Sequence, residues 1–389
     1  MRILHSIHSV NPAGGGVIEA VRQVAQVHQA SGHLCEIVSL DGPDDIWVRD
    51  SPLKVHALGP GRTSYGYSAR FFPWLKAHRG DYDAVIVNGL WQYSGLGVWR
   101  ALRGCGTPYF VFPHGMLDPW FKRAYPLKHL KKWAYWPWAE YRVLRDARAV
   151  LFTCEEERRV ARESFWLYRC REKVVNYGIA APPGNADAQK QSALDRFPEL
   201  RGKRVLLFLG RIHEKKGCDL LIKAFAKILE TPDPDLLLVF AGPDQTGWTN
   251  DLRALADRLQ IAGQIHWAGM ILGDIKWGML RLAEVFVLPS HQENFGIAVA
   301  EALACGTPVL LSNKVNIWRE IAEDHAGLVE NDDAPGTTRL LQRWLALPSE
   351  EKDEMRQNAE RTFHARFAIT RTASALIEAL AETSPGLCS

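Results

Sequence analysis

The sequence lacks the features that mark secreted, membrane-spanning and nucleic-acid-binding proteins. Its seven cysteines are scattered over 389 residues without a CxxC pair, so they indicate neither a disulfide framework nor a zinc site. No apolar run reaches about 18 residues, the length of a membrane-spanning helix, and residues 1–7 are typical of a strand rather than of a signal peptide. The formal charge is only +3, which indicates no nucleic-acid partner. These absences predict a cytoplasmic globular protein.

Length and periodicity predict two α/β domains. At about 150 residues per domain, the simplest division of the chain is into two. Short apolar runs alternate with amphipathic stretches, such as residues 17–30, in which valines recur at spacings of three and four. The runs predicted to be strands are 2–8, 35–40, 54–58, 84–88, 109–113, 149–153 and 173–176, then 204–209, 236–241, 264–268, 284–288, 308–312 and 327–329. This alternation predicts two doubly wound parallel sheets covered by helices on both faces.

The boundary between the domains is predicted at residues 181–202, a linker in which small and polar residues interrupt the pattern. Residues 1–180 then form the first domain and residues 203–368 the second. Two such domains in tandem are expected to place the carboxyl ends of their strands on either side of a ligand-binding cleft.

Two loops of the first domain are candidates for ligand binding. Residues 11–16 contain three consecutive glycines ahead of a predicted helix, so the backbone of Gly15 and Gly16 can approach an anion closely. The loop is not GxGxxG, and a plain tight turn is the alternative. His114 directly follows the strand 109–113, where it is either a cleft residue or a buried structural histidine.

Two loops of the second domain carry the charged candidates. Residues 210–217 bring Arg211 and Lys215 or Lys216 to the end of a strand, a combination that suits a diphosphate, although a solvated basic loop is the alternative. Residues 290–296 place Glu293 before a predicted helix 297–304 that carries Glu301. The helix start offers backbone N–H groups to an anion, but an acidic residue there can also serve only to stabilise the helix dipole.

Taken together, these residues resemble the retaining glycosyltransferases of family 4, which have the GT-B fold of two Rossmann-like domains, and the resemblance covers nearly the whole chain. The motifs that carry it are Gly14–Gly16, His114-Gly115, Gly210-Arg211, Lys216-Gly217, Ala241-Gly242-Pro243, Glu293-Asn294-Phe295-Gly296, Glu301-Ala302 and Gly306-Thr307-Pro308-Val309. The resemblance also implies that the last segment, from residue 369 to 389, packs back on the first domain.

The resemblance implies a role for each charged candidate. Arg211 and Lys216 would hold the diphosphate of a nucleotide-sugar donor and stabilise the departing nucleoside diphosphate. Glu293 would bind hydroxyls of the donor sugar, and Glu301 would bind the ribose. His114 would contact the sugar near its 6-position.

Further residues are implied at the donor and acceptor sides. Gly15 and Gly16 would border the diphosphate and the acceptor, and Ile297 and Ala298 would offer backbone N–H groups to phosphate. The other donor-side residues are Gly210, Gly242, Met270, Asn294, Phe295 and Gly296. On the acceptor side we expect Asn88 and Trp91, although family members often have histidine where this chain has Asn88.

The implied function is transfer of a hexose from a UDP- or GDP-sugar to a glycan or lipid-linked saccharide, as in bacterial exopolysaccharide or O-antigen synthesis. The alternatives are a sugar-nucleotide epimerase of the same fold, which acts on the donor alone, and a catalytically silent binding protein. No cofactor or metal is expected, because the two DxD sequences, 81–83 and 233–235, precede predicted strands and so lie at the wrong end of each sheet.

One basic and aromatic segment has no role in this scheme. Residues 118–148 contain eight Lys or Arg against three acids, together with eight aromatic residues. Lys128, Lys131 and Lys132 share one side of a predicted helix, and Leu127 and Leu130 lie on another. This composition predicts docking on an anionic membrane surface. The alternative is a soluble amphipathic helix whose aromatic residues pack on the neighbouring domain.

Overall fold

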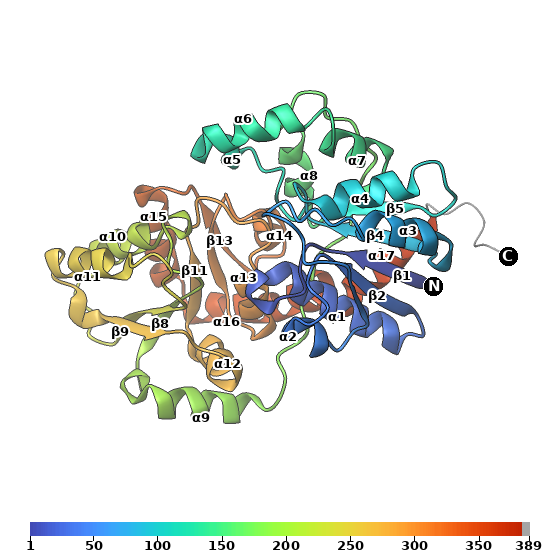
Figure 1. The fold of residues 1–389 in the computed structure, drawn as a ribbon. Coiled ribbons are helices and arrows are strands. Elements are labelled where there is room, and N and C mark those ends of the chain that lie inside the picture. The colour runs from blue at the N-terminus through green and yellow to red at the C-terminus, as the bar shows by residue number, and fades with distance from the viewer. Residues whose placement is uncertain (383–389) are drawn as a thin grey trace. The chain divides into compact units, whose positions relative to one another are not determined.

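The computed structural model describes residues 1–382 and divides into two compact units (Figure 1). Unit 1 comprises Met1–Ala180 together with helix α17 (Ile369–Glu382), and unit 2 comprises Ala181–Ala368. Residues 383–389, the end of the segment expected to return to the first domain, lie outside the described residues. Among the described helices, none combines the length and the apolar character needed to cross a bilayer.

Unit 1 contains a seven-stranded parallel sheet in the order β3-β2-β1-β4-β5-β6-β7. The strands are β1 (Arg2–Ser6), β2 (Leu34–Ser39), β3 (Val55–Ala57), β4 (Ala84–Asn88), β5 (Tyr109–Phe112), β6 (Ala149–Phe152) and β7 (Glu172–Val174). Strand β4 is buried at every residue, as expected for a strand in a sheet with both faces covered.

The helices of unit 1 cover both faces of this sheet. They are α1 (Gly16–Ala30), α2 (Ile46–Arg49), α3 (Phe71–His78), α4 (Tyr93–Leu102), α5 (Trp120–Ala124), α6 (Pro126–Tyr135), α7 (Glu140–Asp146) and α8 (Glu155–Ala161), with short 3-10 turns η1 (Pro12–Gly14) and η2 (Arg79–Asp81). Helix α17 packs on α1, where Leu376 and Leu380 join the same apolar core as Ile18 and Val21. The C-terminal helix is therefore an integral part of unit 1.

Unit 2 contains a six-stranded parallel sheet in the order β10-β9-β8-β11-β12-β13. The strands are β8 (Arg204–Leu209), β9 (Leu236–Ala241), β10 (Ile265–Gly269), β11 (Val285–Leu288), β12 (Val309–Ser312) and β13 (Gly327–Glu330). The helical elements are α9 (Ala186–Arg196), η3 (Pro198–Leu200), η4 (Glu214–Lys216), α10 (Cys218–Ile228), α11 (Thr249–Arg258), η5 (Ala262–Gln264), α12 (Gly273–Leu282), α13 (Ile297–Ala304), α14 (Trp318–Glu323), α15 (Ala334–Ala346), α16 (Ser349–Thr362) and η6 (Phe363–Phe367).

The segment 181–202, expected to be a linker, is instead a structured part of unit 2. The Asn185 side chain accepts hydrogen bonds from two backbone amides and begins α9. Helix α9 packs so closely on α12 that a Cβ at Gly278 would lie 1.9 Å from the Gln189 carbonyl oxygen. The contact face of α9 uses Gln189 and Ala193, so the apolar periodicity that marks most helices is absent from its sequence.

In both sheets the strand order reverses beside the first strand of the unit. In unit 1 the order reverses between β1 and β4, and in unit 2 between β8 and β11. Doubly wound sheets bind ligands at such switch points, outside the carboxyl ends of the strands. The loops that follow these four strands are therefore where a site is expected in each unit.

Candidate functional site

In unit 2, the loop after β8 lies directly against the loop after β9. Gly242 has a φ of 137°, and a Cβ there would lie 1.9 Å from the Gly210 carbonyl oxygen. The Gly210 amide donates a hydrogen bond to the Ala241 carbonyl at 2.9 Å. The backbone contact at this end of the sheet is possible only because residue 242 has no side chain.

The loop after β8 also contacts the loop after β11, across the switch point. Gly217 has a φ of 67°, and a Cβ there would lie 2.3 Å from the Pro289 carbonyl oxygen. The His291 amide donates to the Lys215 carbonyl at 2.8 Å. Glycine at 217 thus allows the short turn η4 to bring Lys216 to the second loop.

Lys216 and Glu293 form an ion pair at this point, and both side chains are largely buried. Burial, with the positive charges of Lys215 and Arg211, lowers the pKa of Lys216 to about 7. The Glu293 carboxylate acts in the opposite direction and favours the charged ammonium. Arg211 itself is exposed. The switch point of unit 2 therefore gathers two cations of the β8 loop and one carboxylate of the β11 loop.

The backbone around Glu293 is held rigidly. Its amide donates to the Lys314 carbonyl at 2.9 Å, and its carbonyl accepts from the Asn316 amide at 3.0 Å. The Asn316 side chain donates to Asn294 at 3.4 Å, and the buried Phe295 packs edge-on against Phe367. These contacts fix the direction in which the Glu293 side chain leaves the loop.

Helix α13 begins immediately after this loop. Gly296 precedes it with a φ of 75°, and no side chain caps its first turn. The amides of Ile297 and Ala298 thus begin a helix whose dipole favours an anion.

Glu301 and Met270 lie beyond these loops in unit 2. The Glu301 carboxylate accepts a hydrogen bond from the Lys276 ammonium at 2.6 Å, and that ammonium also lies 4.0 Å from the centre of the Trp277 ring. Lys276 was not predicted as a site residue, because nothing in its sequence context on α12 distinguishes it from a surface lysine. Met270 is exposed beyond the end of β10.

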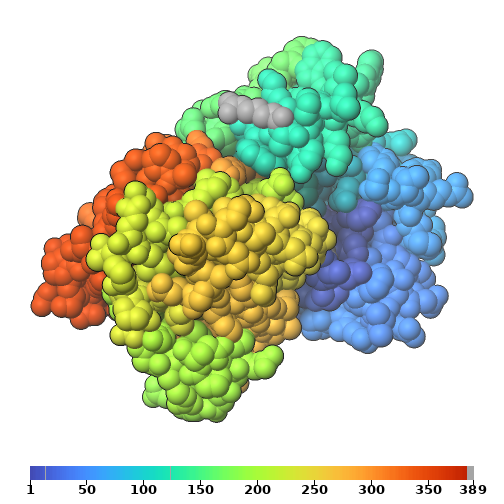
Figure 2. Space-filling view, turned by 90° about the vertical axis from the view of Figure 1, so that its left-hand side faces the viewer, coloured from blue at the N-terminus to red at the C-terminus, as the bar shows by residue number. Residues whose placement is uncertain are grey.

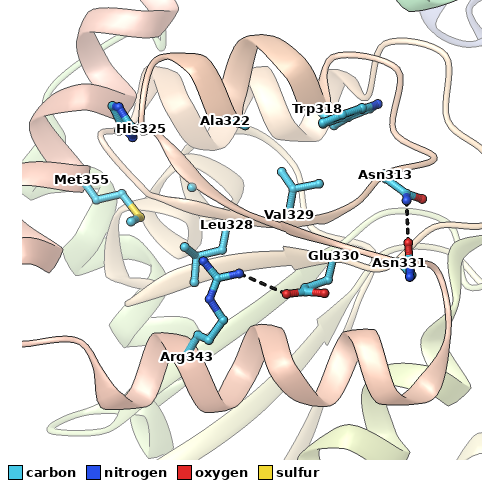
Figure 3. A pocket seen from close by; sticks show the side chains of 11 residues that line it. Asn313, Trp318, Ala322, His325, Leu328, Val329, Glu330, Asn331, Arg343 and Met355 are labelled. Atoms are coloured by element: carbon cyan, nitrogen blue, oxygen red, sulfur yellow. Dashed lines mark hydrogen bonds and ion pairs between the residues drawn. The ribbon is translucent and has the colours of Figure 1, made fainter.

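A separate pocket in unit 2 contains none of the predicted residues. Figure 3 shows it between α14, which carries Trp318 and is followed by His325, and α15, which carries Arg343. Its floor is the edge strand β13, where Glu330 pairs with Arg343 at 3.1 Å. The cavity volume is about 490 Å³. Because β12 lies between β13 and the switch-point strand β11, this pocket is distinct from the candidate site.

In unit 1, His114 occupies a strained turn after β5. Its φ is 50°, unusual for a residue with a Cβ, and Gly115 follows at 74°. The turn is anchored by Glu157, which accepts from the Gly115 amide at 2.6 Å and from the Thr153 hydroxyl at 2.7 Å. The prediction missed Glu157 because it lies on a helix far along the chain, and only the fold brings it to the turn.

The surroundings of His114 connect three of the predicted residues. Burial lowers the pKa of His114 to about 4, so the ring is neutral at pH 7. Its Nε2 lies 3.3 Å from Asn88 Oδ1, and its ring meets that of Tyr177 edge-on. The Tyr177 hydroxyl donates to the Gly16 carbonyl at 3.0 Å. Asn88, His114 and Gly16 thus form one group at the switch point, next to Gly15, whose φ is 84°.

Trp91 contacts a different set of residues in unit 1. With a φ of 70°, its amide donates to Glu140 Oε1 at 2.6 Å. Its indole contacts the rings of Trp136 and Phe165, and the Lys132 ammonium lies 4.6 Å from its centre. The indole is therefore packed into the helical layer formed by α6 and α7.

Glu140, the partner of Trp91, predicts a pH dependence of stability. Its side chain is completely buried, and burial raises its pKa from 4.5 to about 7. Because the unfolded chain ionises first, the folded state loses stability as the pH rises from about 4.5 to about 7, by about 3 kcal/mol in all. Glu140→Gln has no group to titrate here and so avoids this loss. The difference in free energy of unfolding between Glu140→Gln and the wild type should therefore rise by about 3 kcal/mol, in favour of the variant, between acidic and mildly alkaline pH. Denaturant unfolding measures this difference.

Glu36, a carboxyl with the opposite shift, provides the control. Burial alone would raise its pKa, but hydrogen bonds from His56, Tyr82 and Lys54 outweigh burial and lower the pKa to about 2. Glu36→Gln should therefore destabilise the protein most at neutral pH and less as the pH falls below about 4.5. Relative to the wild type, a pH trend of the same sign in the two variants would contradict one of the two assignments.

The two DxD sequences lie at the amino ends of strands. Asp83 accepts a hydrogen bond from the Arg2 amide at the start of β1, and Asp233 pairs with Arg204 at the start of β8. Within residues 1–382, no three His, Cys, Asp or Glu side chains are grouped as a metal site would require.

Two family models cover most of the sequence. The model described as Glycosyl transferases group 1 matches residues 190–362, and that described as Glycosyl transferase 4-like domain matches residues 15–178. The chain belongs to this glycosyltransferase family. Its two parallel α/β units have the GT-B fold of the family, so the predicted fold class is confirmed.

Curated members of the family show the same relationship. A D-inositol 3-phosphate glycosyltransferase of Jonesia denitrificans is 27% identical over 93% of this chain and 90% of its own length. The D-rhamnosyltransferase WbpZ of Pseudomonas aeruginosa is 29% identical over 51% of this chain and 50% of its own length. For most such relatives the chain spans between 31% and 50% of the relative's length.

Solved structures agree on the fold. Anabaena Alr3699/HepE in complex with UDP superposes with a TM-score of 0.78 at 16% identity, covering 98% of this chain and 100% of that one. Sucrose-phosphate synthase from Thermosynechococcus elongatus superposes with a TM-score of 0.75 at 22% identity, covering 98% of both chains.

Proposed function

We propose that this glycosyltransferase moves a hexose from a nucleoside-diphosphate sugar to a hydroxyl of a glycan or lipid-linked saccharide in the cytoplasm, retaining the anomeric configuration and using no metal. The observation that carries the proposal is the meeting of Lys216 and Glu293 at the switch point of unit 2. In the reaction, the bond from the anomeric carbon to the diphosphate oxygen breaks, a bond to the acceptor oxygen forms, and the proton of the acceptor hydroxyl passes to the departing diphosphate.

Lys216 and Arg211 bind the diphosphate in this proposal. Negative charge grows on the leaving diphosphate in the transition state, so fixed cations that face it lower the barrier. Lys216 is prepared for this role by burial, because an ammonium with few water contacts gains more from a phosphate than an exposed one does. A bound diphosphate also keeps Lys216 charged, since a nearby anion raises the pKa of an ammonium.

Glu293 and the start of α13 complete the donor site. When Lys216 turns to the diphosphate, the Glu293 carboxylate can accept hydrogen bonds from hydroxyls of the donor sugar. The amides of Ile297 and Ala298 face a phosphate, as helix starts commonly do. Glu301 binds the ribose through Oε2, while Oε1 stays with Lys276.

In unit 1, His114 and Asn88 bind sugar hydroxyls. A neutral imidazole can both donate and accept a hydrogen bond, and the low pKa of His114 keeps it neutral at physiological pH. The structures of HepE in complex with UDP and with UDP-glucose support a nucleotide-sugar donor of the same class. The epimerase alternative is not favoured, because the matching family models describe transferases.

Turnover measured with and without an acceptor tests this function. We first expect one of UDP, GDP or ADP to raise the melting temperature, since a ligand at about 100 times its Kd stabilises by about 2.7 kcal/mol. The matching sugar nucleotide should then release its nucleoside diphosphate much faster with an acceptor saccharide present, and a chelator should leave the rate unchanged. Conversion of the donor alone to an epimer, or loss of activity with chelator and recovery with manganese, would contradict the proposal.

A further inference from the structure

Helix α6 of unit 1 presents its apolar side to solvent. Leu127 is 78% exposed and Leu130 is 64% exposed, and Ala134 on the same side is also exposed. An amphipathic helix of a soluble domain ordinarily buries this side. In Figure 1, α5 and α6 project from the sheet of unit 1, and in Figure 2 their teal segment lies at the molecular surface.

The opposite side of α6 explains this orientation. The rings of His129 and Trp136 both stack on Phe165, with centres 4.8 and 4.4 Å apart. The Lys132 ammonium lies over the rings of Trp91 and Phe121. These aromatic and cation–π contacts hold the helix with its leucines outward. The exposure of the leucines therefore follows from the packing of α6 on unit 1.

A second segment extends the exposed apolar surface. Trp166, which is 54% exposed, follows α8, and its ring centre lies 5.9 Å from that of Trp133 on α6. The neighbouring Leu167 is also exposed, at a φ of 49° that is unfavourable for leucine. We call Leu127, Leu130, Trp133, Trp166 and Leu167 the α6 patch. Exposed aliphatic and aromatic side chains gathered in this way mark an interaction surface.

The charges beside the patch identify its partner. Lys128 and Lys131 are exposed on the flank of α6, within a segment that carries a net +5 over residues 118–148. A second copy of the chain is a poor partner, because a two-fold interface would bring the same lysines of both copies together. An anionic bilayer offers both complements: phosphate groups for the lysines, and a boundary region in which tryptophan and leucine side chains are favourable.

We propose that the α6 patch docks this protein on the surface of an anionic lipid bilayer. Leu127, Leu130 and Leu167 enter the boundary between headgroups and acyl chains, while Trp133 and Trp166 lie at the level of the headgroups. The proposal concerns unit 1 alone and does not depend on the glycosyl-transfer chemistry.

Vesicle flotation of the full-length chain tests the proposal. The wild type should float with vesicles of phosphatidylcholine and phosphatidylglycerol at low salt, and much less with phosphatidylcholine alone. Each basic side chain near such a surface contributes a factor of about five, so Lys128→Gln/Lys131→Gln should lower the partition coefficient about 30-fold. Leu127→Ser/Leu130→Ser should abolish flotation. The matched controls Lys76→Gln on α3 and Leu259→Ser in unit 2 replace exposed residues outside the patch and should float like the wild type.

Two further measurements keep the proposal falsifiable. Far-UV circular dichroism and melting curves should match the wild type, because the replaced side chains are exposed. Brominated lipids should quench the tryptophan fluorescence of the wild type more than that of Trp133→Phe/Trp166→Phe. Flotation unchanged by both double variants would overturn the proposal. So would a wild-type dimer in sedimentation that Leu127→Ser/Leu130→Ser converts to a monomer.

Discussion

Replacement of Lys216 by alanine is expected to lower kcat by about 100-fold or more, because loss of one preorganised charge donor raises a barrier by about 2.7–4 kcal/mol. In the proposed reaction the Lys216 ammonium contacts the leaving diphosphate, whose charge is largest in the transition state. Arg211→Ala removes the second cation of the same loop and should have an effect of similar size. Steady-state kinetics with saturating donor and acceptor measure both.

The controls must separate catalysis from folding. Lys216→Ala leaves Glu293 without its partner, so the double variant Lys216→Ala/Glu293→Gln, which removes the orphaned charge, should regain stability in melting curves but not activity. Lys223→Ala, on the exposed side of α10, should retain wild-type turnover. Unchanged turnover in both Lys216→Ala and Arg211→Ala would refute the assignment of the diphosphate site.

The sequence predicted the sheets well because their strands are continuous apolar runs with both faces buried. The predicted bounds of β4, β8 and β9 coincide with those of the structure. The edge strand β7, predicted at 173–176, instead spans Glu172–Val174, where pairing with β6 decides its length. Helix α9 was missed because its packing uses glutamine, alanine and a glycine of α12, which leave no apolar period.

In the candidate site, too, the sequence indicates the residues that belong to local motifs but not those that are brought in by packing. Gly217 and Gly242 lie in motifs that carry the family resemblance, and the structure shows why each is glycine, because a Cβ there would clash with backbone. No local pattern in the sequence indicates Lys276, which contacts Glu301, or Glu157, which anchors the His114 turn. Both contacts depend on the packing of elements that are distant in the sequence. For α6, periodicity predicted the two sides of the helix, but the contacts of His129 and Trp136 with Phe165 decided which side faces inward.

Gly242→Ala is expected to destabilise unit 2 by about 3 kcal/mol or more and to abolish turnover, for a reason that lies entirely in the backbone. A φ of 137° is unfavourable for any residue with a side chain, and the new Cβ would lie 1.9 Å from the Gly210 carbonyl oxygen. The clashing atom is backbone, so relief requires the β8 loop to move away from the β9 loop. That movement also displaces Arg211, the residue after Gly210, from the proposed diphosphate site.

Gly263→Ala is the control that separates the backbone clash at residue 242 from the general effect of replacing glycine by alanine. Gly263 lies in the exposed turn η5, and a Cβ there meets no atom within 4 Å. Alanine at that position should leave the free energy of unfolding within about 1 kcal/mol of the wild type, or raise it slightly by restricting the unfolded chain. Denaturant unfolding of the two variants therefore has opposite expected outcomes. Equal stability of Gly242→Ala and Gly263→Ala would mean that the β8 and β9 loops do not approach as closely as the contact between Gly210 and Gly242 requires.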